Sequence, residues 1–500
     1  MIPRTAALIL LAAVMVASAA IGGEPPLPPG MGGGEKEKKR DAPPPLPPGM
    51  GGEEKGGGDA PPLPPGMGGD EKKPDAPPLP PGMGEDAPRA PARKKREWKL
   101  PFDLGGFIEA RGGGRTQKDD QKDATVGEVR LQLEIEKAWE RITGRLTFDL
   151  YYDGVAEDHD DVDLEDGSGF LDLREANLAG SPLDFADVKV GRQVLTWGTG
   201  DLLFINDLFP KDWRSFFVGR DDEYLKAPSD AVKLSLFSKV INLDAVYVPR
   251  FDPDRFITGE RISYYSPVAG KRVGRDHIVD AEVPDDVFED DEVALRLFGN
   301  AAGYELAAYY YHGYWKSPGG FDPLEGRATF PDLDVWGCSV RGKLGKGIAN
   351  LEFGYYESGD DPDGDDPLVG NGQLRFLVGY SQELARDFSA GVQWYVEHTL
   401  DHDEYRDSLP PEAPVADESR HVLTLRLTRM LMKQNLRLSL FVYWSPTDRD
   451  AYLRPRAHYK IDDHWSAEVG GNVFLGEDEH TFFGQFEKNN NVYAGARYSF

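Results

Sequence analysis

Basic side chains recur at alternate positions in several segments, and this spacing places them on one face of a strand. The set comprises Arg130, Arg145, Arg426, Arg437, Arg454, Arg456, Lys460 and Arg497, with His458 between two of its members. A guanidinium group binds a carboxylate or a phosphate as a fork, so a row of arginines suits anionic solutes. Glu134, Glu136 and Asp149 occupy similar positions in the N-terminal segments. The arginines could therefore bind a passing anion, or pair with acids across strands and brace a wall.

Motifs for catalysis or for a bound cofactor are not supported by the spacing of the reactive residues. Residues 337–343 read Gly-Cys-Ser-Val-Arg-Gly-Lys, but Leu344 stands where a phosphate-binding loop has Ser or Thr. Cys338 is the single cysteine, which excludes an internal disulfide, a four-cysteine metal site and a C-x-x-C-H haem attachment. We therefore predict no catalytic residue, no metal site, no cofactor and no enzymatic activity.

The elements that would position the basic residues are strands. After residue 100, apolar and polar residues alternate with a period of two, as in 129–136, 145–152, 388–397, 423–428 and 436–443. A tilted strand needs about ten residues to cross a bilayer, which is close to the length of these runs. If the apolar positions face lipid, the interleaved positions, including the eight basic residues, line a pore.

The connections between these runs alternate in length. Short turns are expected at 299–303, 345–347, 385–387, 433–435 and 462–464, and long polar loops at 154–169, 198–230, 250–291, 315–332, 359–371, 399–419 and 475–488. Short turns on one side and long loops on the other are typical of an outer-membrane barrel. The trace from Phe102 to Phe500 gives 18 antiparallel strands. Sixteen is the alternative, because the alternation is blurred near 170–197.

Two N-terminal segments precede the predicted barrel. Residues 1–19 combine a positive start, an apolar run and a small-residue cleavage site, which is typical of a secretory signal peptide. Residues 20–99 repeat the phrase Pro-Pro-Leu-Pro-Pro-Gly-Met-Gly, which begins at Pro25, Pro44, Pro61 and Pro77. We expect a disordered Pro/Gly-rich linker in the periplasm, since this composition cannot bury a core. It is either a solvated spacer or a ligand for a periplasmic or cell-wall partner.

Net charge and the length of apolar runs argue against two classes of protein, and the charge distribution leaves ion selectivity open. The net charge is −29, which argues against a nucleic-acid partner. Beyond the N-terminus no apolar run reaches the roughly 18 residues of a spanning helix, so a helical membrane protein is excluded. Most of the negative charge falls in the predicted long loops, where it either concentrates cations at the mouth or keeps the protein dispersed.

Aromatic residues gather near the ends of the predicted strands. The groups that fit interfacial girdles are Tyr310, Tyr311, Tyr314 and Trp315, then Tyr443 and Trp444, and finally Trp465. Ordinary core aromatics would account for some of them. Phe500 ends a run with apolar or aromatic residues at 492, 494, 496 and 498. This ending is similar to the C-terminal strand by which bacterial outer-membrane barrels are recognised for insertion.

One stretch also carries a family resemblance. Its parts are Leu173-Arg-Glu-Ala176, then Val190-Gly-Arg-Gln-Val-Leu-Thr-Trp-Gly-Thr-Gly-Asp201, and then Asp207-Leu-Phe-Pro-Lys-Asp212. This stretch resembles the alginate-export-type porins, and the resemblance implies an outer-membrane barrel with a transport role. It departs from them at Phe209, where relatives often have Asn before the proline.

These observations predict an all-β transmembrane barrel over residues 100–500 in the lipid of the bacterial outer membrane. We predict a porin or exporter that gives passive passage to small polar or anionic solutes or to an anionic polymer. The loops 198–230 and 250–291 are long enough to fold inward as a constriction. The alternatives are a barrel that sheaths a separate multi-haem cytochrome as an electron conduit and, third, a barrel hydrolase. The oligomeric state is left open.

Overall fold

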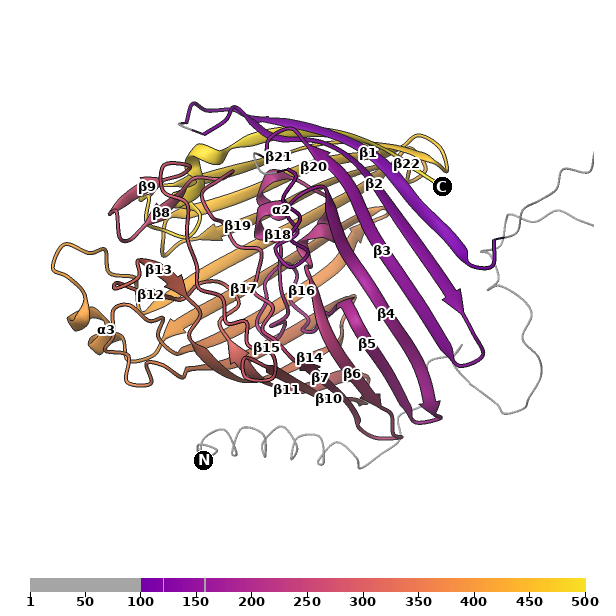
Figure 1. Cartoon of the computed structure of the whole chain (residues 1–500), viewed down its shortest axis with the longest axis horizontal. Coiled ribbons are helices and arrows are strands. Elements are labelled where there is room, and N and C mark those ends of the chain that lie inside the picture. The colour runs from indigo at the N-terminus through magenta and orange to yellow at the C-terminus, as the bar shows by residue number, and fades with distance from the viewer. Residues whose placement is uncertain (1–99, 120, 157–158) are drawn as a thin grey trace, which may run out of the picture. The chain divides into compact units, whose positions relative to one another are not determined.

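A computed structural model describes residues 100–119, 121–156 and 159–500 (Figure 1). The expected signal peptide (1–19) and Pro/Gly-rich linker (20–99) lie outside the described residues, so both stay predictions. Eighteen antiparallel strands form one sheet that closes on itself, which confirms the predicted fold class and strand number. Within the described part, no helix is both long enough and apolar enough to cross a membrane.

Each barrel strand pairs with its neighbours in chain order. The strands are β1 Asp103–Arg115, β2 Ala124–Ala138, β3 Ile142–Asp153, β4 Leu171–Leu183, β5 Ala186–Val194, β6 Pro228–Leu236, β7 Asn242–Val248, β10 Glu292–Ala301, β11 Tyr304–Tyr314, β14 Asp332–Leu344, β15 Gly347–Ser358, β16 Gln373–Ala385, β17 Phe388–Thr399, β18 Ser419–Leu431, β19 Leu436–Ser445, β20 Asp450–Lys460, β21 Trp465–Gly476 and β22 Asn491–Ser499. β1 pairs with both β2 and β22, and this closes the barrel. Gly106 and Phe500 exchange backbone hydrogen bonds of 3.0 and 3.2 Å at the seam.

The alternation read from the sequence decides which side chains face inward. In the β2–β3 pair, Leu131 lies opposite Leu150 and Leu133 opposite Phe148, whereas Gln132 lies opposite Asp149. Side chains opposite each other in an antiparallel pair point to the same face of the sheet. The apolar pairs therefore share the outer face of the barrel, and the polar residues between them share the inner face.

Turn and bulge chemistry explains where the strand pattern was clear and where it was blurred. β10 and β11 are joined by Ala302 and Gly303, which have φ of 52° and 84°. Positive φ at both central residues is what a type I′ two-residue hairpin turn requires. In contrast, the register shifts between Thr147 and Phe148 and again near Gly180. Each bulge moves later side chains to the other face, so the alternation near 170–197 is interrupted although β4 and β5 are present.

Short elements lie in the long loops. The β8–β9 hairpin (Tyr264–Ser266 and Lys271–Val273) is in loop 249–291, and β12–β13 (Gly320–Asp322 and Arg327–Thr329) is in loop 315–331. The helix α3 (His402–Ser408) and the 3-10 helix η2 (Gly484–Asn489) are in the last two long loops. These elements lie on the long-loop side, which is called the mouth below.

The connection between β5 and β6, residues 195–227, contains the helix α2 (Trp213–Val218) and the 3-10 helix η1 (Asp222–Leu225). Its apolar residues Ile205, Phe216 and Phe217 form a buried cluster with inward residues of the wall, among them Leu377 on β16 and Tyr452 on β20. The prediction that this loop folds inward is therefore confirmed. It is called the inserted segment below.

Candidate functional site in the barrel interior

The outer surface carries two belts of exposed aromatic residues. Tyr152, Trp394 and Trp444 lie toward the mouth ends of their strands, and Trp139, Phe185 and Trp465 lie at the short-turn ends; all six are exposed. Exposed leucines and valines occupy outward positions between these belts, such as Leu146 and Leu150. An apolar band between aromatic girdles is the exterior of a barrel that spans a membrane.

The aromatic residues noted in the sequence divide between the girdles and the barrel interior. Trp444 and Trp465 are about half exposed, as expected of girdle residues, but Tyr311 and Tyr443 are each only 4% exposed. Both belong to the buried cluster that packs around the inserted segment, and Trp315 packs against that cluster. Tyrosines at neighbouring positions of one strand point to opposite faces, so proximity to a strand end could not separate girdle residues from interior ones.

The register places the eight predicted basic residues on the inner face. Arg130 lies opposite Glu109 and Tyr151, and Arg426 lies opposite Phe441. The remaining opposite pairs that establish this are Arg145 with Glu136, Arg437 with His458, Arg454 with Phe441, Arg456 with Ser439, Lys460 with Ser466, and Arg497 with Glu109. That these residues line a path for solutes stays a prediction.

On the N-terminal side of the barrel, the arginines pair with wall carboxylates. Arg130 forms ion pairs with Asp149 and Glu128, and its guanidinium also lies over the ring of Tyr151, 4.3 Å from the ring centre. Arg145 bridges Glu136 and Glu175 at 3.5 and 3.3 Å. These contacts join adjacent strands, so here the arginines brace the wall.

On the C-terminal side, the arginines pair mainly with the inserted segment. Arg426 donates a hydrogen bond of 2.6 Å to Asp201. Arg454, Arg456 and Arg497 pair with carboxylates of residues 221–223. Two members differ: Lys460 pairs with Asp463 in the adjoining short turn, and Arg437 has no ionic or hydrogen-bonding partner among the described residues.

Hydrogen bonds from the wall also fix the backbone of the inserted segment. Tyr443 donates to the carbonyl of Leu202 at 2.8 Å, and Asn491 donates to the carbonyl of Phe217 at 3.2 Å. From another part of the wall, Arg174 of β4 donates to the carbonyl of Lys226 at 2.7 Å. Because β4, β19 and β22 all hold it, the segment crosses the interior instead of lying on one part of the wall.

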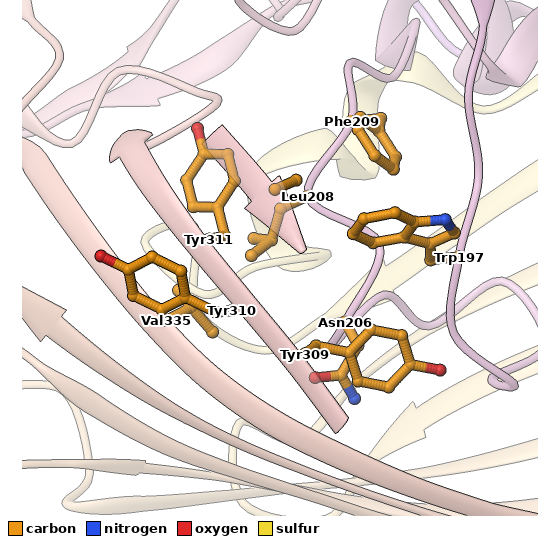
Figure 2. Close-up of a pocket in the computed structure, with 9 residues that line it drawn as sticks. Trp197, Asn206, Leu208, Phe209, Tyr309, Tyr310, Tyr311 and Val335 are labelled. Atoms are coloured by element: carbon orange, nitrogen blue, oxygen red, sulfur yellow. The ribbon is translucent and has the colours of Figure 1, made fainter. Parts of the chain in front are cut away.

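The fit of the inserted segment against β10, β11 and β14 is close. Figure 2 shows Trp197, Asn206 and Phe209 of the segment facing Tyr309 and Tyr311 of β11. The cavity between them has a volume of about 10 Å³, which is at most the space for a single water molecule. Trp197 meets Phe209 edge-to-face, with the ring centres 4.9 Å apart. The segment therefore fills this side of the interior with packed side chains.

The stretch 207–212, noted in the sequence, is the most buried polar part of the segment. Asp207 accepts a hydrogen bond of 3.1 Å from Lys211 and also pairs with Lys226. Burial lowers the pKa of Lys211 to about 8, although the Asp207 carboxylate opposes the shift. Asp254, from loop 249–291, accepts from the backbone N–H of Lys211 at 2.7 Å. The motif therefore joins the inserted segment to a second loop.

A larger cavity of about 250 Å³ opens at the mouth, where the inserted segment meets loops 154–170 and 249–291. Its lining includes Arg214, which pairs with Asp166 at 2.8 Å, and Arg220, which pairs with Glu128. Burial alone would raise the pKa of Asp166, but the adjacent Arg214 brings that pKa below its ordinary value. The cavity is therefore lined largely by charges that already pair with each other.

The sequence named Asp149 and Glu136, which pair with Arg130 and Arg145, but it did not identify the other acidic partners of the arginines. Glu128 lies beside Arg130 on β2, whereas Asp201 and the carboxylates of 221–223 lie far in the chain from Arg426, Arg456 and Arg497, and only the closed barrel brings them together. The available signal was the inward register of Glu128 beside Arg130. The carboxylates of the inserted segment carried no periodic signal, because the segment is irregular.

A closed, even-numbered antiparallel barrel with an apolar exterior and a charged interior has the architecture of an outer-membrane barrel. The chain belongs to the family described as "Protein of unknown function (DUF1302)", whose model matches residues 110–362. That description assigns no activity, and the alginate-export resemblance stays a prediction. No curated protein matches the chain.

Solved porin structures are similar in architecture. Pseudomonas aeruginosa OccD3 (OpdP) has 8% sequence identity and a TM-score of 0.47, over 79% of this chain and 91% of that one. Pseudomonas aeruginosa OccK11 (OpdR) has 8% identity and a TM-score of 0.45, over 80% and 95%. A Rhodopseudomonas blastica porin triple mutant has 10% identity and a TM-score of 0.36, over 80% and 100%. The strand pairing described above, and not these distant likenesses, defines the fold.

Proposed function

We propose that this protein is an outer-membrane channel that gives passive passage to small polar or anionic solutes. The observation that carries the proposal is the contrast between the two faces of the wall. Outward positions are apolar, whereas inward positions carry the arginines of β18, β20 and β22 and their acidic partners. A barrel of this size has room for an aqueous path, and a charged lining selects among ions.

The inserted segment sets the width of that path. Its apolar part packs with the wall near the mouth, and its acidic residues meet the arginines of the C-terminal strands. Residues 195–227 thus take the place of a constriction, as the loop length predicts. The same segment occupies interior space that a sheathed cytochrome would need, so the structure does not favour the electron-conduit alternative.

Single-channel recording of the refolded full-length protein in a planar bilayer tests the proposal. We expect discrete conductance steps in potassium chloride, because a water-filled barrel conducts ions. With a salt gradient across the bilayer, the reversal potential should indicate anion preference if the interior arginines dominate. Folding is checked by the strand signal in circular dichroism and by faster migration of the unheated sample in SDS gel electrophoresis. A barrel that is folded by these criteria and never conducts would contradict the proposal.

A further inference from the structure

Three consecutive acidic residues of the inserted segment lie against three arginines of the wall. The acidic tripeptide is Asp221, Asp222 and Glu223, and the arginine cradle is Arg454, Arg456 and Arg497. The tripeptide begins η1, and the cradle belongs to β20 and β22. Residues distant in sequence are therefore brought together by the entry of the segment into the barrel.

The contacts are multiple and shared. Asp222 binds Arg454 at 2.9 Å and Arg456 at 3.1 Å. Asp221 binds Arg456 at 3.0 Å and lies 3.7 Å from Arg497, and Glu223 binds Arg497 at 2.8 Å. Two of the carboxylates thus bridge two arginines each. A single anion with several charged groups could make the same set of contacts.

Solvent reaches the carboxylates more easily than the arginines. The side chains of Asp222 and Glu223 are 47% and 43% exposed, whereas Arg454 and Arg456 are 8% and 9% exposed. Ion pairs with one well-solvated partner contribute little to stability, because water and salt compete for that partner. The acidic tripeptide is therefore the exchangeable side of the contact.

The arginine cradle is held in place by other groups. Arg454 lies over Phe216 and Arg497 over Phe107, with the guanidinium 3.9 and 3.8 Å from the ring centres. Arg456 pairs with the buried Glu468. Arg497 also pairs with Glu109 at 2.9 Å, and Arg111 binds both of these buried glutamates. Without the acidic tripeptide, four arginines would share two wall carboxylates and carry excess positive charge.

We propose that the arginine cradle is a binding site for a solute that carries two or three carboxylate or phosphate groups, and that the acidic tripeptide occupies this site as an internal competitor. The proposal deepens the channel function and rests on it for the route by which the solute arrives. An oligo-anion is preferred over a single anion, because it replaces several of the tripeptide's ion pairs at once. When the solute binds, its anionic groups replace the carboxylates of the acidic tripeptide on the arginines, and η1 is released from the wall.

Calorimetric titration of the full-length protein in detergent tests the site with propane-1,2,3-tricarboxylate as the probe. The variant Asp221→Asn/Asp222→Asn/Glu223→Gln removes the competitor, so we expect its affinity for the tricarboxylate to be at least tenfold higher than that of the wild type. Acetate should bind neither protein measurably. Tripolyphosphate replaces the tricarboxylate in a parallel titration, and the tighter of the two identifies the anion class.

A matched control separates the cradle from the general field of the protein. Glu412→Gln/Asp417→Asn/Glu418→Gln removes an equal number of negative charges, three, from exposed positions in loop 400–418. This control should change the affinity less than twofold. Adding Arg456→Lys/Arg497→Lys to the tripeptide variant keeps the positive charge but removes the forks, and it should weaken binding at least tenfold. Equal affinity in wild type and tripeptide variant, or an equal gain in the control, would overturn the proposal. If the triple variant does not fold, Glu223→Gln alone is expected to give about a threefold gain, and no gain would overturn it.

The titration does not depend on conduction, so the two proposals fail separately. A protein that binds the tricarboxylate more tightly after loss of the tripeptide but never conducts overturns the channel and supports the cradle. A protein that conducts but shows no such gain overturns the cradle and supports the channel.

Discussion

The indole N–H of Trp213 donates a hydrogen bond to Asp254 Oδ2 at 2.9 Å, which joins the first residue of α2 to loop 249–291. The same carboxylate accepts from the hydroxyl of Ser317 at 2.8 Å and from the backbone N–H of Lys211 at 2.7 Å. One buried aspartate thus links the inserted segment to two mouth loops. The position of the inserted segment depends on these loops as well as on the arginines of the wall.

Replacing Asp254 should loosen the inserted segment. Asp254→Ala leaves three donors without an acceptor, and each buried unsatisfied donor costs about 1–3 kcal/mol. We expect faster trypsin cleavage after Arg214 and Arg220 in the intact barrel, measured by mass spectrometry. Asp363→Ala, at an exposed position in loop 359–372, is the control and should leave cleavage unchanged. Equal cleavage rates in both variants would contradict the role given to Asp254.

The packing of the mouth loops should depend on pH near neutrality. Burial and the adjacent Glu292 raise the pKa of Asp252 to about 7, and Lys316 only partly offsets this. Asp252 accepts from the backbone N–H of Asp230 at 3.0 Å, and Glu292 also accepts from the hydroxyl of Tyr311. Because this pKa lies above the unfolded value of about 3.9, the stabilisation is complete below that value, is lost as pH rises toward 7, and changes no further above it.

The channel should therefore open more often at pH 7 than at pH 5. The measurement is open probability in single-channel recordings from pH 5 to pH 8, which should rise up to about pH 7 and then level off. Asp252→Asn keeps the hydrogen bond to Asp230 and cannot ionise, so it should remove the pH dependence and hold the low-pH behaviour. If the variant keeps the wild-type pH profile, another group is responsible.

Arg437 should influence ion selectivity without affecting folding. It faces the interior opposite His458 and has no ionic partner among the described residues, so its charge is not neutralised by the protein. We expect Arg437→Glu to shift the reversal potential in a salt gradient toward cation preference. The free energy of unfolding should change by less than about 0.5 kcal/mol, as for most exposed substitutions. Arg449→Glu, in a turn at the mouth, is the control. An equal shift of the reversal potential in this variant would mean that the net charge of the protein, and not the position of Arg437, causes the effect.

A charged side chain on the outer face should lower the folding stability in lipid much more than the same side chain on the inner face. Leu133 lies opposite Phe148 on the outer face, between the girdle residues Trp139 and Tyr152. Leu133→Lys places an ammonium group in the hydrocarbon layer, and we expect a loss of about 2–4 kcal/mol in folding stability in lipid vesicles. Glu134→Lys, one position on and facing inward, should cost under about 1 kcal/mol. Denaturant titration in vesicles gives both values, and similar losses would contradict the assignment of the faces.

The strand pattern was predictable because each strand needs only local information. The alternation in 129–136 and 436–443 sets the two faces, and the pairing of β2 with β3 and of β18 with β19 follows from short connections. Where a bulge interrupts the period, as near Thr147 and Gly180, the pattern became ambiguous although the strands remained. Local alternation cannot report a register shift that depends on the partner strand.

The partners of the arginines were not predictable in the same way. The sequence identified Arg426 and Arg456 as inward residues but left open whether they meet an anion or a carboxylate of the wall. In the folded protein they meet Asp201 and Asp221, which lie more than two hundred residues earlier in an irregular segment. A contact of this kind exists only once the barrel has closed around the segment.

The sequence by itself therefore determined the 18-strand barrel, its two faces and the inward placement of the basic residues, because a period of two couples each residue to its face of the sheet. Only the tertiary structure decided that residues 195–227 cross the interior and that their carboxylates occupy the arginine cradle. The physical reason is that these contacts depend on the apolar packing of Phe216 and Phe217 against distant strands, which carries the acidic tripeptide to the wall.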